Sequence, residues 1–115
     1  GPVVNTVTQK INMKLPIRFD SKNNWQVYST ISGKSYSSDE AGIIIKMKNP
    51  YNPRKHLLLI AGKRASGTKA SIIAFLKYFR ELILGNFYDG KMSARIVEGI
   101  DIDSDGVVDD VDFLE

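Results

Sequence analysis

Apolar and polar residues alternate over the first part of the chain. From 11 to 19 every second residue is apolar, which is typical of a strand with one buried face. Pro16 cannot donate a hydrogen bond to a neighbouring strand, so this strand is expected at a sheet edge or with that position turned outward. After a polar turn, alternation resumes over residues 25–31. The two segments predict a β-hairpin, followed by a polar loop over residues 32–40.

The middle of the chain predicts two more strands. Residues 42–48 form a run rich in isoleucine, and a second apolar run spans residues 56–61. Two Asn-Pro steps between them favour extended or turn conformations. The connection of about seven residues is too short for the crossover that parallel neighbours require. These two strands are therefore expected to pair antiparallel.

Residues 68–84 predict the principal helix. Apolar residues at positions 72, 75, 76, 79 and 83 fall on one stripe of such a helix, and Gly85-Asn86 provides a left-handed stop. A strand at 94–100 would complete a parallel, right-handed β-α-β unit with the strand before the helix. Renewed alternation over residues 107–113 predicts a hairpin with that strand.

Together these elements predict an α/β fold in a single domain spanning residues 1–115. We expect a mixed β-sheet with an N-terminal hairpin, one β-loop-α-β unit with its helix at about 68–84, and a C-terminal β-hairpin. A length of 115 residues suits one domain, and 43% hydrophobic with 25% charged residues is typical of a folded chain. No apolar run is long enough for a transmembrane segment. Gly1-Pro2 resembles a remnant of tag removal, and we expect the chain to be the C-terminal fragment of a longer protein.

The net charge of +3 hides a division along the chain. Residues 1–100 carry all 16 Lys and Arg against six acidic residues, whereas residues 101–115 carry seven acidic residues and no base. This asymmetry indicates one surface for anions and another for cations. Alternatively, the acidic tail packs beside the basic surface and the two neutralise each other.

Residues 62–69 join the strand at 56–61 to the helix and have the composition of a phosphate-binding loop. In a nucleotide-hydrolysing loop the final glycine is followed by lysine and then a hydroxyl residue, whereas here Thr68 precedes Lys69. One position along a helix rotates a side chain by about 100°, so nucleotide hydrolysis is not expected. The backbone N–H groups at the start of the helix, beside basic side chains, still favour the binding of an anion. The candidate anion-binding residues are Gly62, Lys63, Arg64, Ser66, Gly67, Thr68 and Lys69.

A structural role would explain the same loop. Gly62 and Gly67 would permit a tight turn from strand to helix, with Gly67 expected at a positive φ. Ser66 or Thr68 would then cap the helix. Both interpretations stay open at this stage.

The Asp-rich segment of residues 101–112 matches the spacing of a calcium-binding loop. Oxygen ligands fall at positions 1, 3, 5, 7, 9 and 12, with Gly106 at position 6. The candidate ligands are Asp101, Asp103, Asp105, the carbonyl of Val107, Asp109 and Asp112. An aspartate at position 12 and strand-like flanks favour the alternative, a hairpin turn built from Asp and Gly. Calcium is the cofactor that the sequence suggests, and no organic cofactor is expected.

Other functional classes have little support in the sequence. His56 is the only histidine and the chain has no cysteine, so a catalytic triad and a thiolate zinc site are not expected. Seven Lys and Arg residues lie between positions 46 and 69, but they are spread over two strands and a loop. Nucleic-acid binding is therefore not expected, and enzymatic activity is disfavoured.

Three segments together resemble the C-terminal region of archaeal S-layer-like proteins. They are DEAGIIIKMKNPYNPRKHLLLIAG, KRASGTKASIIAFL and RIVEGIDIDSDGVVDDVDFLE, and the similarity covers residues 36–115. Its most specific parts are the Asn-Pro pairs at 49–53, the loop at 61–68 and the Asp-rich terminus. The resemblance implies a structural role in the cell envelope or a surface array, with this chain itself or other envelope proteins as partners.

Two hypotheses follow. In the first, the chain is a non-catalytic structural or assembly domain of an archaeal cell-surface protein, with a C-terminal hairpin that calcium stabilises. In the second, it is an anion- or nucleotide-binding module that uses the strand, loop and helix at 62–69. The resemblance implies a cell-surface or extracellular location, while a cytoplasmic location is left open.

Overall fold

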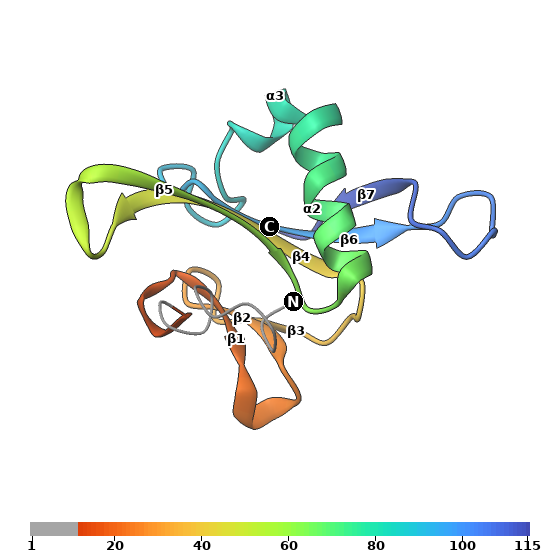
Figure 1. The fold of residues 1–115 in the computed structure, drawn as a ribbon, viewed down its shortest axis with the longest axis horizontal. Coiled ribbons are helices and arrows are strands. Elements are labelled where there is room, and N and C mark those ends of the chain that lie inside the picture. Colours follow the sequence, from red (N-terminus) through yellow and green to blue (C-terminus); the bar gives the residue numbers. More distant parts are fainter. Residues whose placement is uncertain (1–11) are drawn as a thin grey trace.

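Two antiparallel sheets and a helix are stacked in three layers in the computed structural model, which describes residues 12–115 (Figure 1). The smaller sheet has the order β1 (Ile17–Asp20), β2 (Gln26–Ser29) and β3 (Ser35–Tyr36). The larger sheet has the order β5 (Asn52–Gly62), β4 (Ala41–Asn49), β6 (Ala94–Ile100) and β7 (Asp110–Phe113). The helices are α2 (Ala65–Lys77) and α3 (Phe79–Leu82), with short 3-10 turns η1 (Asn12–Lys14) and η2 (Ser21–Asn23). The predicted α/β fold is confirmed; Gly1-Pro2 lies outside the described residues.

The N-terminal hairpin is confirmed, because β1 and β2 pair antiparallel with Phe19 opposite Val27. Its first strand is shorter than expected and begins at Ile17. The residues before it form η1, which the Asn12 amide fixes through hydrogen bonds of 2.7 and 2.8 Å to the Phe19 carbonyl and N–H. The polar loop contains an additional short strand, β3, which extends this sheet.

Strand β4 lies between β5 and β6 and pairs antiparallel with both. The predicted antiparallel pairing of β4 with β5 is confirmed, as is the C-terminal hairpin of β6 with β7. Strands β5 and β6 run in the same direction, as the β-α-β prediction requires, but they are not neighbours. The connection through α2 therefore crosses over β4, so every strand pair in the described residues is antiparallel.

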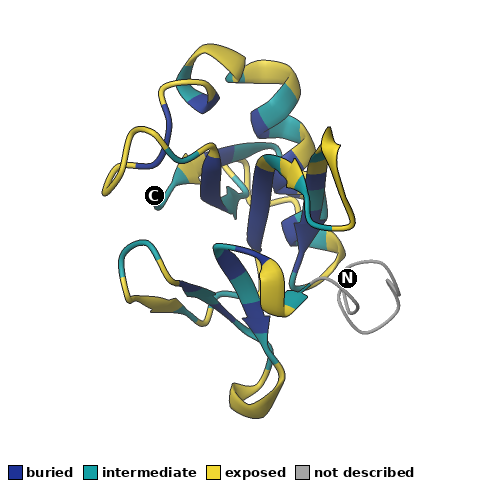
Figure 2. Cartoon of the chain, turned by 90° about the vertical axis from the view of Figure 1, so that its left-hand side faces the viewer, coloured by how far each residue is buried: buried dark blue, intermediate teal, exposed yellow. Residues whose placement is uncertain are grey.

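Strand β4 sends alternate isoleucines into two separate apolar cores. Ile43 and Ile45 point towards the smaller sheet, whereas Ile44 points towards α2. Both faces of β4 are therefore buried, which explains its continuous run of isoleucine (Figure 2). The core between the sheets contains Leu15, Ile17, Phe19, Val27, Ala41, Ile43, Ile45, Leu59, Ala61, Ala94 and Ile96.

Helix α2 packs on the sheet through its small residues. Its buried positions are Gly67, Ala70, Ser71 and Ala74. A Cβ atom added at Gly42 of β4 would lie 2.2 Å from the Gly67 carbonyl oxygen, so the helix backbone approaches the strand too closely for larger side chains. Gly67 is helical rather than at a positive φ, which corrects the sequence-based expectation; it is needed for this close approach.

The predicted helix at 68–84 is divided into two. Helix α2 begins at Ala65 and ends at Lys77, and Tyr78 leaves the helical conformation with φ −123° and ψ 36°. The Tyr78 hydroxyl donates a hydrogen bond to Asp110 of β7, and its ring lies edge-on to Phe113 at 6.4 Å. The expected left-handed stop is present at Gly85, with φ +85°, where it follows α3.

A buried carboxylate connects the two sheets. Glu115 accepts hydrogen bonds from Ser29, from Ser32 at 2.7 Å and from Tyr36 at 2.6 Å, all on or beside the smaller sheet. Asn86 donates to it from the other side at 3.1 Å. Burial alone would raise the pKa of Glu115, but these donors outweigh burial and hold the pKa below its ordinary value. The smaller sheet is thus attached by a charged network as well as by apolar packing.

Candidate functional site

The N-terminus of α2 faces a carboxylate from the chain itself. Asp39, in the loop before β4, accepts from Lys63 Nζ at 3.0 Å and Arg64 Nε at 3.2 Å. The hydrogen bond from Lys63 is the main cause that lowers the pKa of Asp39. Two of the three basic side chains proposed to hold an external anion are therefore paired with an internal one.

The hydroxyl groups of this loop do not cap the helix. Arg64 is the residue at the N-cap position and makes no capping hydrogen bond through its side chain. Ser66 Oγ donates to the Asp39 carbonyl at 3.3 Å, and Thr68 Oγ1 donates to the Arg64 carbonyl at 3.4 Å. The tight turn itself is present, since a Cβ atom at Gly62 would lie 2.1 Å from the Thr68 nitrogen. Glycine is therefore required here, while the expected serine or threonine cap is absent at this helix start.

The Asp-rich segment brings together part of the predicted calcium ligands. Among the described residues, Asp101, Asp103 and Asp109 each offer a carboxylate oxygen, and these oxygens lie within 4.8 Å of one another. Backbone N–H groups hold all three carboxylates, with Gly106 donating to Asp101 at 2.7 Å, Ile102 to Asp109 at 3.0 Å and Asp105 to Asp103 at 3.3 Å. Three carboxylates at this separation can coordinate a divalent cation.

Two carboxylates of this cluster affect each other's protonation. The pKa of Asp103 is raised, chiefly by its hydrogen bond with Asp101, whereas the pKa of Asp101 is lowered, chiefly by the hydrogen bond from the Gly106 N–H. Adjacent carboxylates resist simultaneous ionisation unless positive charge compensates them. A cation bound between them would remove this conflict.

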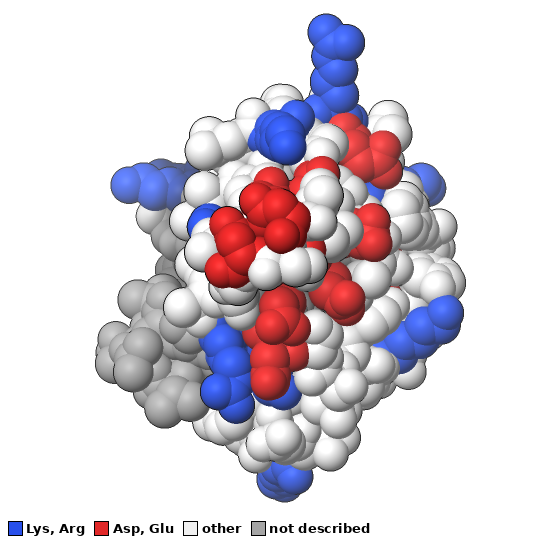
Figure 3. Space-filling model, turned by 90° about the vertical axis from the view of Figure 1, so that its right-hand side faces the viewer, with Lys and Arg blue, Asp and Glu red and all other residues white. Residues whose placement is uncertain are grey.

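Two of the other predicted ligands, Asp105 and Asp112, lie outside the cluster. The carboxylate of Asp105 accepts from the Val107 N–H at 2.9 Å. Asp112 lies in β7, where it is exposed and opposite Glu98 of β6. Figure 3 shows acidic side chains spread over this end of the molecule. The structure therefore supports a smaller ligand set than the spacing of a full calcium-binding loop predicts.

The two sequence-predicted sites lie side by side. A shallow hollow is lined by Ser66 and Lys69 of α2 on one side and by Asp101 and Gly106 on the other. A second contact joins Lys77 to Asp110 at 3.9 Å. The acidic tail thus packs beside basic residues of α2. This supports the interpretation in which the acidic tail and the basic surface neutralise each other.

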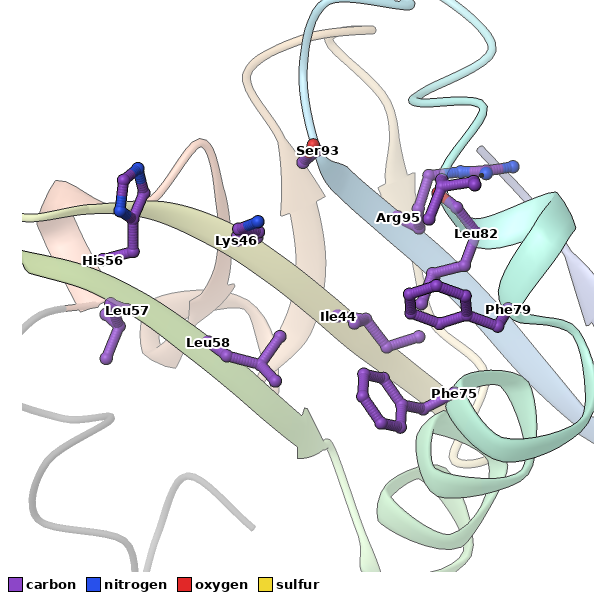
Figure 4. A pocket seen from close by; sticks show the side chains of 11 residues that line it. Ile44, Lys46, His56, Leu57, Leu58, Phe75, Phe79, Leu82, Ser93 and Arg95 are labelled. Carbon is purple, nitrogen blue, oxygen red and sulfur yellow. Dashed lines mark hydrogen bonds between the residues drawn. The ribbon is translucent and has the colours of Figure 1, made fainter.

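An apolar groove between the β4–β5 hairpin and the helices was not predicted. Phe75 of α2 and Phe79 of α3 lie across from Leu58 and Ile44 of the sheet (Figure 4). The cavity has a volume of about 490 Å³. Its lining residues are Ile44, Lys46, His56, Leu57, Leu58, Phe75, Phe79, Leu82, Ile83, Ser93 and Arg95.

The sequence did contain a signal for this groove. The helical stripe of large apolar residues, which usually marks the side facing the core, instead supplies Phe75, Phe79 and Ile83 to the groove. Leu76 and Ile72, also on this stripe, are exposed, Leu76 to 76%. The small residues on the opposite side of α2 indicate the face that packs against the sheet.

Arg95 of β6 lines the apolar groove and is itself buried. Its side chain is 1% exposed and lies between the rings of Phe87 and Phe113, at 4.8 and 4.6 Å. Arg95 Nε donates to the Glu115 carbonyl at 2.6 Å, and Nη1 donates to the Glu81 carbonyl at 2.5 Å. Burial lowers the pKa of Arg95. The guanidinium therefore holds α3 and the C-terminal segment against β6.

Comparison with known proteins finds a relative in an archaeon. The chain is 31% identical over 81 residues to a protein of Methanocaldococcus jannaschii described as uncharacterized. The match covers 70% of this chain and 16% of the relative, so the chain spans a small part of the relative's length. No family model matches the chain. No solved structure matches it.

Across the described residues, no helix has the length and apolar character needed to cross a membrane.

Proposed function

We propose that this chain is a non-catalytic structural and assembly domain of an archaeal cell-surface protein of the S-layer-like kind. The observation that carries the proposal is the orientation of α2. Its small residues face the sheet, Ile73 and Phe75 are only partly buried against the core, and Ile72 and Leu76 are exposed to solvent. Contiguous apolar surface of this kind is typical of a protein interaction site.

The outward apolar residues continue beyond α2. Phe79, Ile83 and Leu84 are exposed on or after α3, and Leu58 is exposed on β5. Removing such surface from water contributes about 25 cal/mol per Å². Association with another protein surface would provide this burial.

The edge of the larger sheet supports the same proposal. Strand β5 has 11 residues and, within the part of the chain that the structure describes, pairs only with β4. An open edge presents backbone N–H and C=O groups that can pair with another chain. The relative from M. jannaschii contains the similar segment within a much longer chain, which agrees with a domain of a larger protein.

The cellular location of the natural protein tests this proposal independently of any association in solution. Antibodies raised against the chain would be used on intact cells of the source organism, before and after treatment with an external protease. We expect labelling of intact cells and its loss on proteolysis, while a cytoplasmic protein in the same cells stays protected. Detection only after cell lysis would contradict a cell-surface role.

Calcium binding by the C-terminal hairpin is a second part of the proposal. It is supported by the convergence of Asp101, Asp103 and Asp109 and by the opposite pKa shifts of the first two, lowered for Asp101 and raised for Asp103. Bound calcium would join the two sides of the loop between β6 and β7 and stabilise the hairpin.

The alternative function, an anion- or nucleotide-binding module, is less well supported. Asp39 already accepts from Lys63 and Arg64, so an external anion would have to displace this carboxylate. Only Lys69 of the predicted basic residues lines the neighbouring hollow, which it shares with Glu40 and Asp101. These carboxylates would repel a phosphate.

A further inference from the structure

We propose that the apolar groove binds the Asp-rich loop of a second copy of this chain, so that the copies associate head to tail. This inference rests on the proposed assembly function and names the partner of that surface. The Asp-rich loop is here the segment of residues 101–109 between β6 and β7.

The chemistry of the groove selects an apolar partner that carries negative charge. Leu58, Phe75 and Phe79 form apolar walls, while Lys46 and His56 lie among the lining residues nearer the hairpin end. Within the described part of the chain, no carboxylate lines the groove. Basic residues at the edge of an apolar surface favour an acidic partner and disfavour a basic one.

The Asp-rich loop has the complementary chemistry. Ile102 is 68% exposed and Val107 is 48% exposed, so the loop presents two large apolar side chains to solvent. Asp103 and Asp105 lie between them in the sequence and are also exposed. A turn that combines exposed apolar side chains with carboxylates matches both the walls and the charge of the groove.

The two surfaces lie in different parts of the molecule. Along the longest axis, which measures 43 Å, the loop forms one end, and the β4–β5 hairpin that borders the groove forms the other (Figure 1). The loop of one molecule therefore meets the groove of another molecule rather than its own. A contact between two different surfaces leaves one groove and one loop unused at the ends, so it can continue as a filament or array.

Charge also disfavours the symmetric alternative, in which two grooves face each other. That arrangement would bring Lys46 of both copies towards one another, together with the exposed Arg54 and Lys55 of the hairpin. Like charges placed across an interface cost binding free energy. The head-to-tail contact places opposite charges together instead.

A pair of double variants tests this geometry by sedimentation equilibrium in EDTA, which keeps the loop free of divalent cations. The groove variant Leu58→Ser/Ile83→Ser retains the loop, and the loop variant Ile102→Ser/Val107→Ser retains the groove. All four side chains are exposed, so both variants should keep the thermal transition of the wild type. Leu84→Ser is the matched control, because Leu84 is exposed but does not line the groove.

We expect the wild type and Leu84→Ser to form concentration-dependent oligomers, and each double variant alone to be monomeric. An equimolar mixture of the two double variants should form one-to-one dimers and no larger species, because it contains one intact groove and one intact loop for each pair. Lys46→Glu, a single exposed change, should weaken wild-type association roughly tenfold. It provides a second test if a double variant does not fold.

Three results would overturn the inference: a wild type that is monomeric at every concentration, a loop variant that associates like the wild type, or a mixture that stays monomeric. Failure of Lys46→Glu to weaken association would count against the charge argument and the proposed contact. None of these outcomes affects the surface-labelling experiment, so a wrong contact geometry can be distinguished from a wrong cellular role.

Discussion

The segment of residues 62–69 at the start of α2 and the Asp-rich loop before β7 are both short and charged and both contain glycine, yet their charges meet different surroundings. In the first, Lys63 and Arg64 contact Asp39, which is distant in the sequence. In the second, Asp101, Asp103 and Asp109 face one another and are held by backbone N–H groups. A charged loop is therefore a candidate binding site only where the fold has not already supplied the opposite charge.

Glycine also has different roles in the first turn of α2 and in the Asp-rich loop. At Gly67, the Ala41 carbonyl oxygen would lie 2.0 Å from an added Cβ atom, so the requirement is space. At Gly106, φ is +87° and no atom lies within 4 Å of such a Cβ, so the requirement is backbone conformation. The two requirements predict substitution effects of different size.

Gly67→Ala is expected to have the largest effect. Its Cβ atom would overlap backbone of β4, which can be relieved only by moving α2 away from the sheet. We expect a loss of about 3–5 kcal/mol in the free energy of unfolding, measured by urea denaturation. Gly90→Ala is the control, because the nearest atom to its Cβ is at 3.8 Å, and it should behave as the wild type. Equal midpoints for Gly67→Ala and the wild type would show that helix and strand are not in close contact.

Calcium is expected to have the next largest effect, and only through the Asp-rich loop. At a hundredfold excess over its dissociation constant, it should raise the thermal midpoint by roughly 5–10 °C through binding to the native state. Magnesium should raise it less, because it gives up bound water reluctantly. Asp103→Asn combined with Asp109→Asn should abolish the calcium response.

Asp112→Asn tests which carboxylates bind calcium: the three that converge in the structure, or the larger set that the sequence spacing predicts. Asp112 lies in β7, outside the cluster of three carboxylates, so this variant should keep the full calcium response. Loss of the calcium response in Asp112→Asn would show that Asp112 is a ligand, as the sequence spacing predicts. No response of the wild type to millimolar calcium would remove the metal site altogether.

Gly106→Ala should destabilise the chain moderately, by about 1 kcal/mol, because an L-residue is strained at this φ although space is available. Gly106→Asn should cost less, since asparagine adopts left-handed conformations more readily than alanine. Thermal unfolding without calcium measures both. A larger loss for asparagine than for alanine would indicate a steric requirement instead.

Asp39→Asn should change stability least, because the Asp39 carboxylate is half exposed to solvent in both of its ion pairs. The folded state lowers the pKa of Asp39, so its contribution to stability is present above the ordinary pKa of 3.8 and is lost as pH falls through the folded value. Wild type and variant should therefore differ slightly at pH 7 and become alike at strongly acidic pH. Urea titrations at the two pH values would measure this convergence, and a difference that persists in acid would contradict it.

The same Asp39→Asn variant tests whether Asp39 blocks anion binding. With the carboxylate removed, Lys63 and Arg64 should bind inorganic phosphate more tightly than in the wild type. Amide chemical shifts over residues 65–69 would follow a phosphate titration. Equal binding by both proteins would show that Asp39 does not compete with an external anion.

Local patterns predicted most elements of this fold correctly. Alternation identified the strands of both hairpins, because successive side chains on a strand point to opposite faces. The short Asn-Pro connection predicted the antiparallel pairing of β4 with β5, since a chain of that length cannot cross over the sheet. The spacing of aspartates identified the segment in which three carboxylates converge, although not which of them do so.

Contacts between distant residues decided the rest. A stripe of large apolar residues usually marks the buried side of a helix, but Gly42 and Gly67 bring the backbones of β4 and α2 so close that only small side chains fit between them. The position of β4 between β5 and β6, and the pairing of Asp39 with Lys63, likewise depend on segments that approach only after folding. The sequence determined which segments form strands and helices through local spacing. Tertiary structure decided which faces are buried and which charges remain available, because both depend on what the rest of the chain places against each segment.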